Sequence, residues 1–485
     1  MLTEIRLDKF QGFGEKQTVP LRPLTLIYGP NASGKSSLLR AVRLLHQSIS
    51  TEWPFVRRNT FLFEGEQISL ASFANVVHKH DTDSHIALGF KISLPSRPKR
   101  SRMSQALNLI DAIDVEWTLR DPGEISSVKL RYSVSNLNRP NGQTLLAGSE
   151  VAFEFVYEDE TLKLSSYSGD EALSYIALNH ADSDEFSSSF LGENDIIRGY
   201  ESNFDLSWDA LLGTSDYFLR GVFPAVMRAK PAGGEAALGN VSGQEGLLSM
   251  LLSLPAATLA SSANRTHYVG PLREIEKRLT FQQGLRGEEG GLDNRTSTKL
   301  VNEKISEWLS KLTGGRYTFE PVEFIAGPVE FLGGLKSQIV FDNLTGTMVT
   351  FEDVGVGLSQ VMPILRALHS ISVRKNPDTT DLVLIEQPEL HLHPKMQADL
   401  AQLFTDVLRE RPGAQIIAET HSEAFLLRLQ RLLRSGELRP EDIQILFVDE
   451  AAGSNRVFPL RLDPSNDFEL EMPLSFSGLR LSEYL

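Results

Sequence analysis

The segment Gly29–Ser36 constrains the fold of this chain more than any other stretch. It reads GPNASGKS, which fits the pattern G-x-x-x-x-G-K-[ST] at every fixed position. Five mostly β-favouring residues, 24–28, come before it, and apolar residues at helical spacing follow it. This order of strand, loop and helix is typical of a phosphate-binding loop, whose backbone N–H groups and helix N-terminus face an anion.

The same loop supplies most of the candidate nucleotide ligands. The ammonium of Lys35 would reach the β- and γ-phosphates, and the hydroxyl of Ser36 would ligate Mg²⁺. An ordinary glycine turn is the alternative, but it would not explain both the strand and the helix around the motif. The candidate ligands here are Gly29, Pro30, Asn31, Ala32, Ser33, Gly34, Lys35, Ser36 and Ser37.

A second apolar run, far along the chain, ends in an acidic residue. Residues 382–385 are all apolar, as expected for a parallel strand covered on both faces. Glu386 follows at the carboxyl end, the edge where ligands of α/β sheets bind. Glu386 is therefore the second candidate metal ligand. Pro394 is well placed to open the next helix.

Two further loops carry candidate site residues. A short predicted strand at 415–418 precedes His421, which could contact a γ-phosphate or an attacking water. Alternatively, His421 is a capping or merely exposed residue. Upstream, Gly355, Gly357 and Ser359 stand at the start of a predicted helix, where they would form a second anion-binding end. A short flexible loop is the alternative there.

Together these segments resemble ABC-type ATPases of the SMC/RecF/OLD group, and within it the bacterial AAA15-like family, which is related to DUF3696 proteins. The matching segments lie at both ends of the chain and leave much of 95–265 unmatched. They are 5–14, 29–36, 69–78, 268–274, 353–365, 385–394 and 418–429.

The resemblance implies an α/β fold, a P-loop ABC-type ATPase head formed by both ends of the chain. Alternating apolar residues between Ser84 and Glu160 predict an antiparallel β lobe. Short helical patterns further along predict an inserted, mainly helical middle element. The expected domains are 1–94 (head, N-terminal part), 95–180 (antiparallel β extension), 181–265 (helical insertion) and 266–485 (head, C-terminal part).

The resemblance also implies that ATP and Mg²⁺ are the cofactors and that ATP lies between two protomers of a homodimer or higher homo-oligomer. One protomer would contribute the phosphate loop, Glu386 and His421, and the other the loop containing Ser359. The family has Ser where Gly355 stands, which weakens the expected γ-phosphate contact. Gln67 is a candidate for the glutamine of the family's Q-loop.

Gln387 stands where ABC ATPases usually carry the acid that polarises the attacking water. An amide cannot accept a proton at neutral pH, although it can orient water. Glu389 is the nearest acid that could act as the base, together with His421. The other interpretation of Glu389 is a cap of the following turn. The candidate catalytic residues are therefore Gln387, Glu389 and His421, and turnover is expected to be slow if nothing compensates for Gln387.

A zinc site is the less favoured interpretation of this region. His391, His393 and His421 include the pair H-x-H, but no third ligand has metal-site spacing.

Composition limits the partners. The chain has 485 residues, with 48 basic against 63 acidic side chains and a net charge of −15, so its mean field repels phosphate and disfavours nucleic acid as a general partner. The basic runs Arg97–Arg102 and Arg428–Arg439 remain candidate contacts. The absence of cysteine excludes disulfides and thiolate metal sites. No apolar run approaches the ~18 residues of a membrane helix, so a soluble cytoplasmic protein without membrane contact is expected.

The leading hypothesis is an Mg²⁺-dependent ATPase whose nucleotide-dependent oligomer regulates a partner effector, a nuclease, in bacterial anti-phage defence. It rests on the resemblance, since relatives of this kind occur in systems such as PARIS and Septu. A slowly hydrolysing or non-hydrolysing nucleotide-gated scaffold is the alternative that Gln387 suggests. A RecF-like DNA-repair ATPase is disfavoured by the net charge. The C-terminal residues lack the D-x-D of a Toprim nuclease, so the nuclease is expected to be a separate chain.

Overall fold

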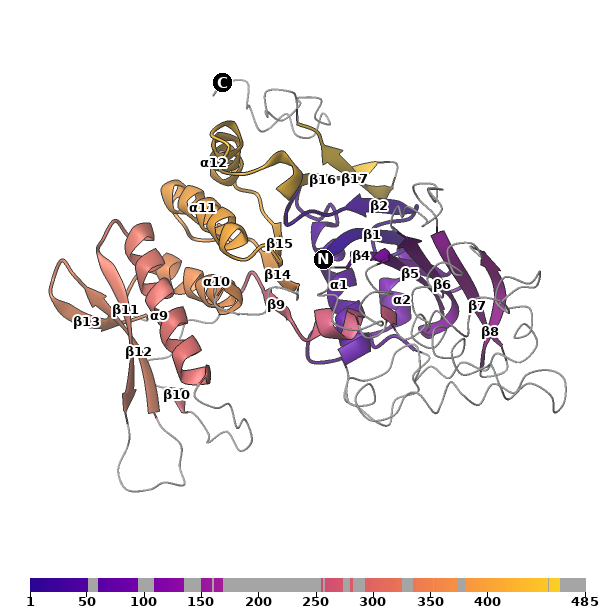
Figure 1. Cartoon of the computed structure of the whole chain (residues 1–485), viewed down its shortest axis with the longest axis horizontal. Coiled ribbons are helices and arrows are strands. Elements are labelled where there is room, and N and C mark those ends of the chain that lie inside the picture. Colours follow the sequence, from indigo (N-terminus) through magenta and orange to yellow (C-terminus); the bar gives the residue numbers. More distant parts are fainter. Residues whose placement is uncertain are drawn as a thin grey trace, which may run out of the picture. The chain divides into compact units, whose positions relative to one another are not determined.

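A computed structural model of the chain forms two compact units (Figure 1). One unit comprises Met1–Leu21, Ala32–Arg265 and Asp449–Val457, and the other comprises Arg22–Asn31, Thr266–Val448 and Phe458–Leu485. Each unit thus combines segments from the two ends of the chain. The structure describes residues 1–50, 60–94, 109–134, 150–158, 161–168, 254–255, 258–273, 280–281, 293–324, 335–351, 353–372, 380–451 and 453–462.

Some of the sequence predictions lie outside these described residues. They include the basic run Arg97–Arg102 and most of the helical insertion expected at 181–265.

The first unit is built on a seven-stranded antiparallel sheet with the order β2-β1-β4-β5-β6-β7-β8. In β6 the side chains alternate between the buried core and the other face, with Val128, Leu130 and Tyr132 inside. The prediction of an antiparallel lobe is confirmed, and the sheet also includes strands from the first 94 residues. The strands are β1 (Leu2–Asp8), β2 (Gln17–Pro20), β4 (Ile86–Ser93), β5 (Ile110–Arg120), β6 (Glu124–Val134), β7 (Glu150–Glu158) and β8 (Thr161–Ser168). The helices are α1 (Lys35–Ser50), α2 (Phe73–Val76) and the 3-10 helix η1 (His78–His80).

A six-stranded sheet has the order β17-β16-β3-β15-β14-β9, and its strands belong to the second unit except for residues 449–457 of β16 and β17, which belong to the first. Neighbouring strands from β16 to β9 pair in parallel. Strands β3 and β15 are buried along their whole length, and β14 up to its last residue, as expected for a parallel sheet covered on both faces. The strands are β3 (Leu24–Tyr28), β9 (Thr266–Val269), β14 (Asp381–Glu386), β15 (Ala414–Glu419), β16 (Ile443–Ala451) and β17 (Ser454–Leu460).

One helix precedes β14 along the chain, and one follows each of β14 and β15. They are α10 (Val356–Ser372), α11 (Pro394–Glu410) and α12 (Glu423–Arg434), with the 3-10 helix η2 (Pro440–Asp442) before β16. Pro394 opens α11, as the sequence predicts. Phe404 of α11 packs edge-on against Phe425 of α12, with ring centroids 5.2 Å apart. Among the described residues, no helix is long and apolar enough to cross a membrane.

A second, antiparallel sheet in this unit was not identified from the sequence. Its strands are β10 (Thr280–Phe281), β11 (Tyr317–Phe324), β12 (Leu335–Asp342) and β13 (Thr347–Thr350). The helix α9 (Asp293–Leu312) lies along it (Figure 1). Buried Trp308 and Leu309 of α9 join Phe319 of β11 in the same hydrophobic core as the parallel sheet.

The strand order brings three separate loops to one edge of the parallel sheet. Ile27 of β3 pairs with Glu419 of β15, and Glu419 in turn lies opposite Glu386 of β14. The phosphate loop and the turns after β15 and β14 therefore all start at the same carboxyl edge of the sheet. Because β15 is the middle strand, Thr420 and His421 follow it between the other two loops.

Two buried histidines predict that the fold is destabilised by mild acid. His46 of α1 and His369 of α10 are 3% and 1% exposed. Burial lowers the pKa of each imidazole from 6.5 to about 4, and the charge of Lys304 acts in the same direction on His369. Between pH 6.5 and 4 the unfolded chain binds protons that the folded chain does not, so stability falls as pH falls, by up to ~3 kcal/mol for each histidine.

Urea unfolding at several pH values from 7 to 4.5 checks this expectation. His369→Leu should flatten the pH dependence, whereas His85→Leu, at an exposed position, should leave it unchanged. Equal slopes for wild type and His369→Leu would contradict the assignment.

Candidate nucleotide-binding site

The phosphate loop has the backbone of an anion cradle. It joins β3 to α1, and φ is positive at Gly29 (146°), Ala32 (63°) and Gly34 (92°). Positive φ at these positions allows the backbone N–H groups of the loop to turn toward an anion. At Ala32 this conformation has a cost of ~1 kcal/mol, because alanine carries a Cβ. The N–H of Ser37 donates to the carbonyl of Gly34 over 3.0 Å, which starts the helix.

Three polar side chains of this loop are buried. Ser33, Lys35 and Ser37 are 4%, 3% and 5% exposed. The Oγ of Ser33 has no hydrogen-bond partner among the described residues. A buried hydroxyl without a partner costs about 1–3 kcal/mol, so a polar ligand at this loop would relieve that cost. The donor set of hydroxyls, ammonium and backbone N–H groups fits a phosphate chain.

Asn455 of β17 packs against the loop and was not identified from the sequence. A Cβ on Gly34 would lie 2.1 Å from Nδ2 of Asn455, and a Cβ on Gly12 would lie 2.0 Å from the same atom. The N–H of Asn455 also donates to the carbonyl of Gly12 over 2.8 Å. Gly34 is therefore required both for its positive φ and for the close approach of Asn455.

Glu386 ends β14 with its carboxylate half-buried. Its Oε1 accepts a hydrogen bond of 2.9 Å from the hydroxyl of Tyr268, which stands on the neighbouring strand β9. Carboxylate oxygen is a ligand that Mg²⁺ prefers, so the chemistry of Glu386 fits the metal role predicted for it. That role stays a prediction.

Gln387 adopts a left-handed conformation, with φ of 47°. Its N–H donates to the carbonyl of Glu419 over 2.8 Å. Its carbonyl accepts a hydrogen bond of 3.0 Å from Nη2 of Arg273, and the same nitrogen donates to the carbonyl of Glu386 over 2.7 Å. The turn after β14 is thus held from two sides.

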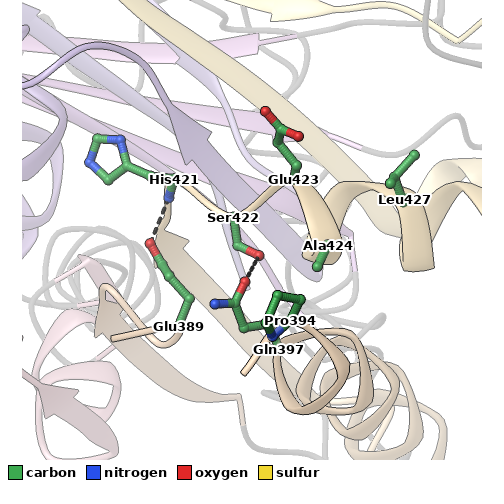
Figure 2. A pocket seen from close by; sticks show the side chains of 8 residues that line it. All are labelled: Glu389, Pro394, Gln397, His421, Ser422, Glu423, Ala424 and Leu427. Atoms are coloured by element: carbon green, nitrogen blue, oxygen red, sulfur yellow. Dashed lines mark hydrogen bonds between the residues drawn. The ribbon is translucent and has the colours of Figure 1, made fainter. Parts of the chain in front are cut away.

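Glu389 contacts the loop after β15 with both carboxylate oxygens. Oε1 accepts from the backbone N–H of His421, and Oε2 accepts from the hydroxyl of Thr420, each over 2.7 Å. The imidazole of His421 is exposed and points away from this carboxylate (Figure 2). The structure brings Glu389 to the backbone of His421 and does not join the two side chains. These contacts lie on the loop after β15 and not on the turn that follows Glu389, so the cap of that turn and the general base both stay predictions.

The negative charge of Glu389 also reaches a buried tyrosine. Burial, and then Glu389, raise the pKa of Tyr28 well above its usual value. The hydroxyl of Tyr28 donates to the carbonyl of Ser422 over 3.1 Å. The last residue of β3 is thereby tied to the start of α12.

A pocket of about 470 Å³ opens at the starts of α11 and α12 (Figure 2). Ser422 caps α12 by accepting from the N–H of Phe425 over 3.1 Å, and it donates to Oε1 of Gln397 over 2.6 Å. His393 caps α11 through Lys395, which gives this histidine a structural role. The pocket is lined by Glu389, Pro394, Gln397, His421, Ser422, Glu423, Ala424 and Leu427.

The signature-like loop lies at the start of α10. Gly355 is exposed, and a Cβ there would meet nothing within 4 Å. A Cβ on Gly357 would lie only 2.5 Å from the carbonyl oxygen of His391. Ser359 is fully buried, and its hydroxyl donates to the carbonyl of Val356 over 2.9 Å. In this structure Ser359 faces its own helix and not the surface, and its contact with a second protomer's nucleotide stays a prediction.

Two residues of the YVGPLRE segment were missed as site residues. Tyr268 and Arg273 lie in this segment, which carries part of the family resemblance but suggests no role by itself. A signal was present, because an arginine and a tyrosine close to a predicted strand end are polar side chains near a ligand edge. Gln67, the Q-loop candidate, has an exposed side chain, and its N–H donates to Oε1 of Gln47 over 3.1 Å.

Comparison with known proteins supports the class that the geometry indicates. A family model described as an AAA domain matches residues 4–187, and one described as an AAA ATPase domain matches residues 243–426. Together with the phosphate loop and the parallel sheet, these matches support a nucleotide-binding protein with segments similar to AAA-type ATPase domains at both ends of the chain. None of the curated proteins compared with the chain matches it.

Several solved structures are similar over most of the chain. The SMC head bound to the C-winged helix domain of ScpA aligns with a TM-score of 0.44 and 12% identity over 96% of this chain and 98% of that chain. The SMC head domain from Thermotoga maritima aligns with a TM-score of 0.37 and 12% identity over 95% of this chain and 99% of that chain. A third structure is the Smc head domain with an extended coiled coil bound to the C-terminal domain of ScpA, derived from Pyrococcus furiosus. It aligns with a TM-score of 0.42 and 11% identity over 95% of this chain and 96% of that chain. Likenesses of this degree carry no argument about function.

The contrast between Gly355 and Gly357 gives a prediction. Gly357→Ala is expected to lower the free energy of unfolding by about 1–3 kcal/mol, because the new methyl group would collide with a backbone carbonyl. Gly355→Ala, with open space around its Cβ, should stay within ~0.5 kcal/mol of wild type. Urea unfolding of the two variants makes the comparison, and equal midpoints would show that α10 does not need this close approach.

Proposed function

We propose that this protein is a slow, Mg²⁺-dependent ATPase whose ATP-bound form is a homodimer or higher homo-oligomer. Three loops at one edge of the parallel sheet support this most strongly. They are the start of the phosphate loop at Gly29, the turn at Glu386–Gln387 and the turn at Thr420–His421, which follow three consecutive strands of the sheet.

The phosphate loop is proposed to hold ATP. The backbone of residues 29–37, the ammonium of Lys35 and the hydroxyl of Ser33 would bind the phosphate chain. Ser36 and Glu386 are the proposed Mg²⁺ ligands. When bound, Mg²⁺ offsets negative charge on the β- and γ-phosphates.

Slow hydrolysis follows from the residues after β14. Gln387 can orient a water molecule but cannot take its proton at neutral pH. Glu389 accepts one hydrogen bond on each oxygen, from Thr420 and from the N–H of His421, and each oxygen keeps a second lone pair that could accept a proton. The proposed order of roles is therefore Gln387 and His421 for positioning the water and Glu389 for accepting its proton.

Exposed apolar side chains next to this turn support assembly with a second copy. Leu272 is 92% exposed and directly precedes Arg273, and Val356 is 50% exposed in the first turn of α10. Apolar side chains exposed beside a binding site are typical of surfaces that another protein covers. A second copy would then present the start of α10 to the nucleotide of the first, and Ser359 would contribute only if its hydroxyl left the carbonyl of Val356.

The biological part of the proposal is regulation of a separate effector, a nuclease, in anti-phage defence in the bacterial cytoplasm. It is supported by the sequence resemblance to ATPases of systems such as PARIS and Septu. The alternative of a nucleotide-gated scaffold is favoured by Gln387, and turnover measurements separate the two functions.

Lys35→Ala is expected to weaken ATP binding by about 100-fold or more, because a phosphate-binding ammonium is removed from a buried loop. Isothermal titration calorimetry with ATP and Mg²⁺ measures the dissociation constant. Lys299→Ala, a surface lysine of α9 that pairs with Glu303, is the control and should bind like wild type. Normal ATP binding by Lys35→Ala would refute the nucleotide site, and unchanged turnover in EDTA would refute the metal dependence.

Glu389→Gln separates the base from the cap. A glutamine can keep both contacts, with its amide oxygen toward the N–H of His421 and its NH₂ toward Oγ1 of Thr420, but it cannot accept a proton. If Glu389 is the base, turnover should fall about 100-fold or more while stability is retained, and the variant should elute with ATP as a dimer in size-exclusion chromatography with light scattering.

Glu423→Gln is the matched control, since Glu423 is exposed in the same pocket and has no assigned role. Turnover of Glu389→Gln close to that of wild type would leave Glu389 only the capping role. A wild type without measurable turnover, but with ATP-dependent assembly, would establish the scaffold.

A further inference from the structure

Arg273 lies at the centre of the contacts between α10 and the end of β14. It follows β9 by four residues, and the residue is 9% exposed. Nη2 donates to the carbonyls of Glu386 and Gln387 over 2.7 and 3.0 Å, and Nη1 donates to the carbonyl of Gln360 over 3.3 Å. One side chain thus bonds to three backbone carbonyls on two elements.

The link between Arg273 and α10 is reciprocal. The side-chain Nε2 of Gln360 donates to the backbone carbonyl of Arg273 over 2.8 Å. Gln360 itself is buried and lies one residue after Ser359, in the second turn of α10. A movement at the start of α10 would therefore shift Arg273 and with it the turn after β14.

The guanidinium stays charged in spite of its burial. Desolvation lowers the pKa of Arg273 to about 10, opposed by the charges of Glu389 and Tyr268. Its Nε is buried and has no hydrogen-bond partner among the described residues. A buried cation of this kind is unfavourable by itself, so its contacts with the three carbonyls are what stabilise it here.

The turn that Arg273 holds is strained. Gln387 has φ of 47°, a region that costs a non-glycine residue ~1 kcal/mol or more. Its N–H is fixed by the carbonyl of Glu419 and its carbonyl by Arg273. These two bonds set the direction in which the side chains of Glu386 and Gln387 leave the strand.

We propose that Arg273 is a positioning residue that fixes the left-handed turn at Gln387 and couples it to α10. This inference rests on the proposed function, in which Glu386 binds the metal and Gln387 orients the water. Arg273 donates to the backbone carbonyls of both residues. Its bonds to these two carbonyls fix the backbone from which the side chains of Glu386 and Gln387 extend. Its bond to the carbonyl of Gln360 links α10 to the same turn.

Arg273→Lys is the sharpest variant. Lysine keeps the charge, but its single nitrogen cannot serve the carbonyls on α10 and on β14 with the separated fork of a guanidinium. Arg411→Lys is the matched control, because Arg411 is 5% exposed and bonds over 3.2 Å to Asp381, the first residue of the same strand. The control removes an equally buried guanidinium at the opposite end of β14.

Hydrogen exchange tests the positioning without any reference to turnover. In Arg273→Lys, the amides of Gln387 and Leu390, which donate to the carbonyls of Glu419 and Gln387, should exchange about tenfold faster than in wild type, and the first turns of α10 should also exchange faster. The same peptides in Arg411→Lys should match wild type. Unchanged exchange at these amides in Arg273→Lys would overturn the proposal.

Steady-state kinetics tests the coupling to hydrolysis. Arg273→Lys should lower kcat roughly 10- to 100-fold, since displacing a catalytic group by about 1 Å has an effect of this size. Its Kd for ATP, measured by calorimetry, should stay within about threefold of wild type. An unchanged kcat with weakened ATP binding would assign Arg273 to nucleotide binding and overturn the positioning role. If wild type itself does not hydrolyse ATP, hydrolysis as the proposed function fails, while hydrogen exchange still decides whether Arg273 fixes the turn.

Discussion

The parallel pairing of β3, β15 and β14 is the constraint on which the candidate site depends. The ladder continues past the strand ends, because Thr420 donates to the carbonyl of Ile27 over 3.0 Å and Gln387 donates to the carbonyl of Glu419 over 2.8 Å. Each loop is therefore anchored to the strand beside it before any side chain contributes. Glu389 then bonds across from one loop to the next. Backbone pairing at the sheet edge therefore brings these loops together, and the side chains add further contacts between them.

The sequence predicts the local parts of this arrangement well. The phosphate loop, the buried strand ending in Glu386 and the helix opened by Pro394 all depend on short patterns of apolar residues, glycine and proline, and the structure contains each of them. Strand order is different, because it depends on pairings between segments far apart in the chain. The antiparallel sheet beside α9 was missed for the same reason, since its short strands are completed only by partners elsewhere.

The direction of polar side chains is the other part that the sequence could not supply. Arginine is mostly exposed in proteins, and nothing in the letters around Arg273 indicates a buried guanidinium bonded to three carbonyls. For Glu389 the sequence leaves a base and a cap as equal alternatives, and for Ser359 it suggests a nucleotide contact. Both side chains bond to nearby backbone or hydroxyl groups in the structure. The partner of such a side chain depends on rotation about one or two of its bonds, and the amino-acid sequence does not determine that rotation locally.

The contact between Asn455 and Gly34 has a consequence for folding during synthesis of the chain. The ribosome synthesises a chain from its N-terminus, so the phosphate loop leaves the ribosome early. Asn455, which packs against Gly34 and bonds to Gly12, emerges only after most of the chain has been made. We expect the loop to take its final form late in translation. A nascent chain would then lack the final conformation of this loop until nearly the whole sequence between these residues had been translated.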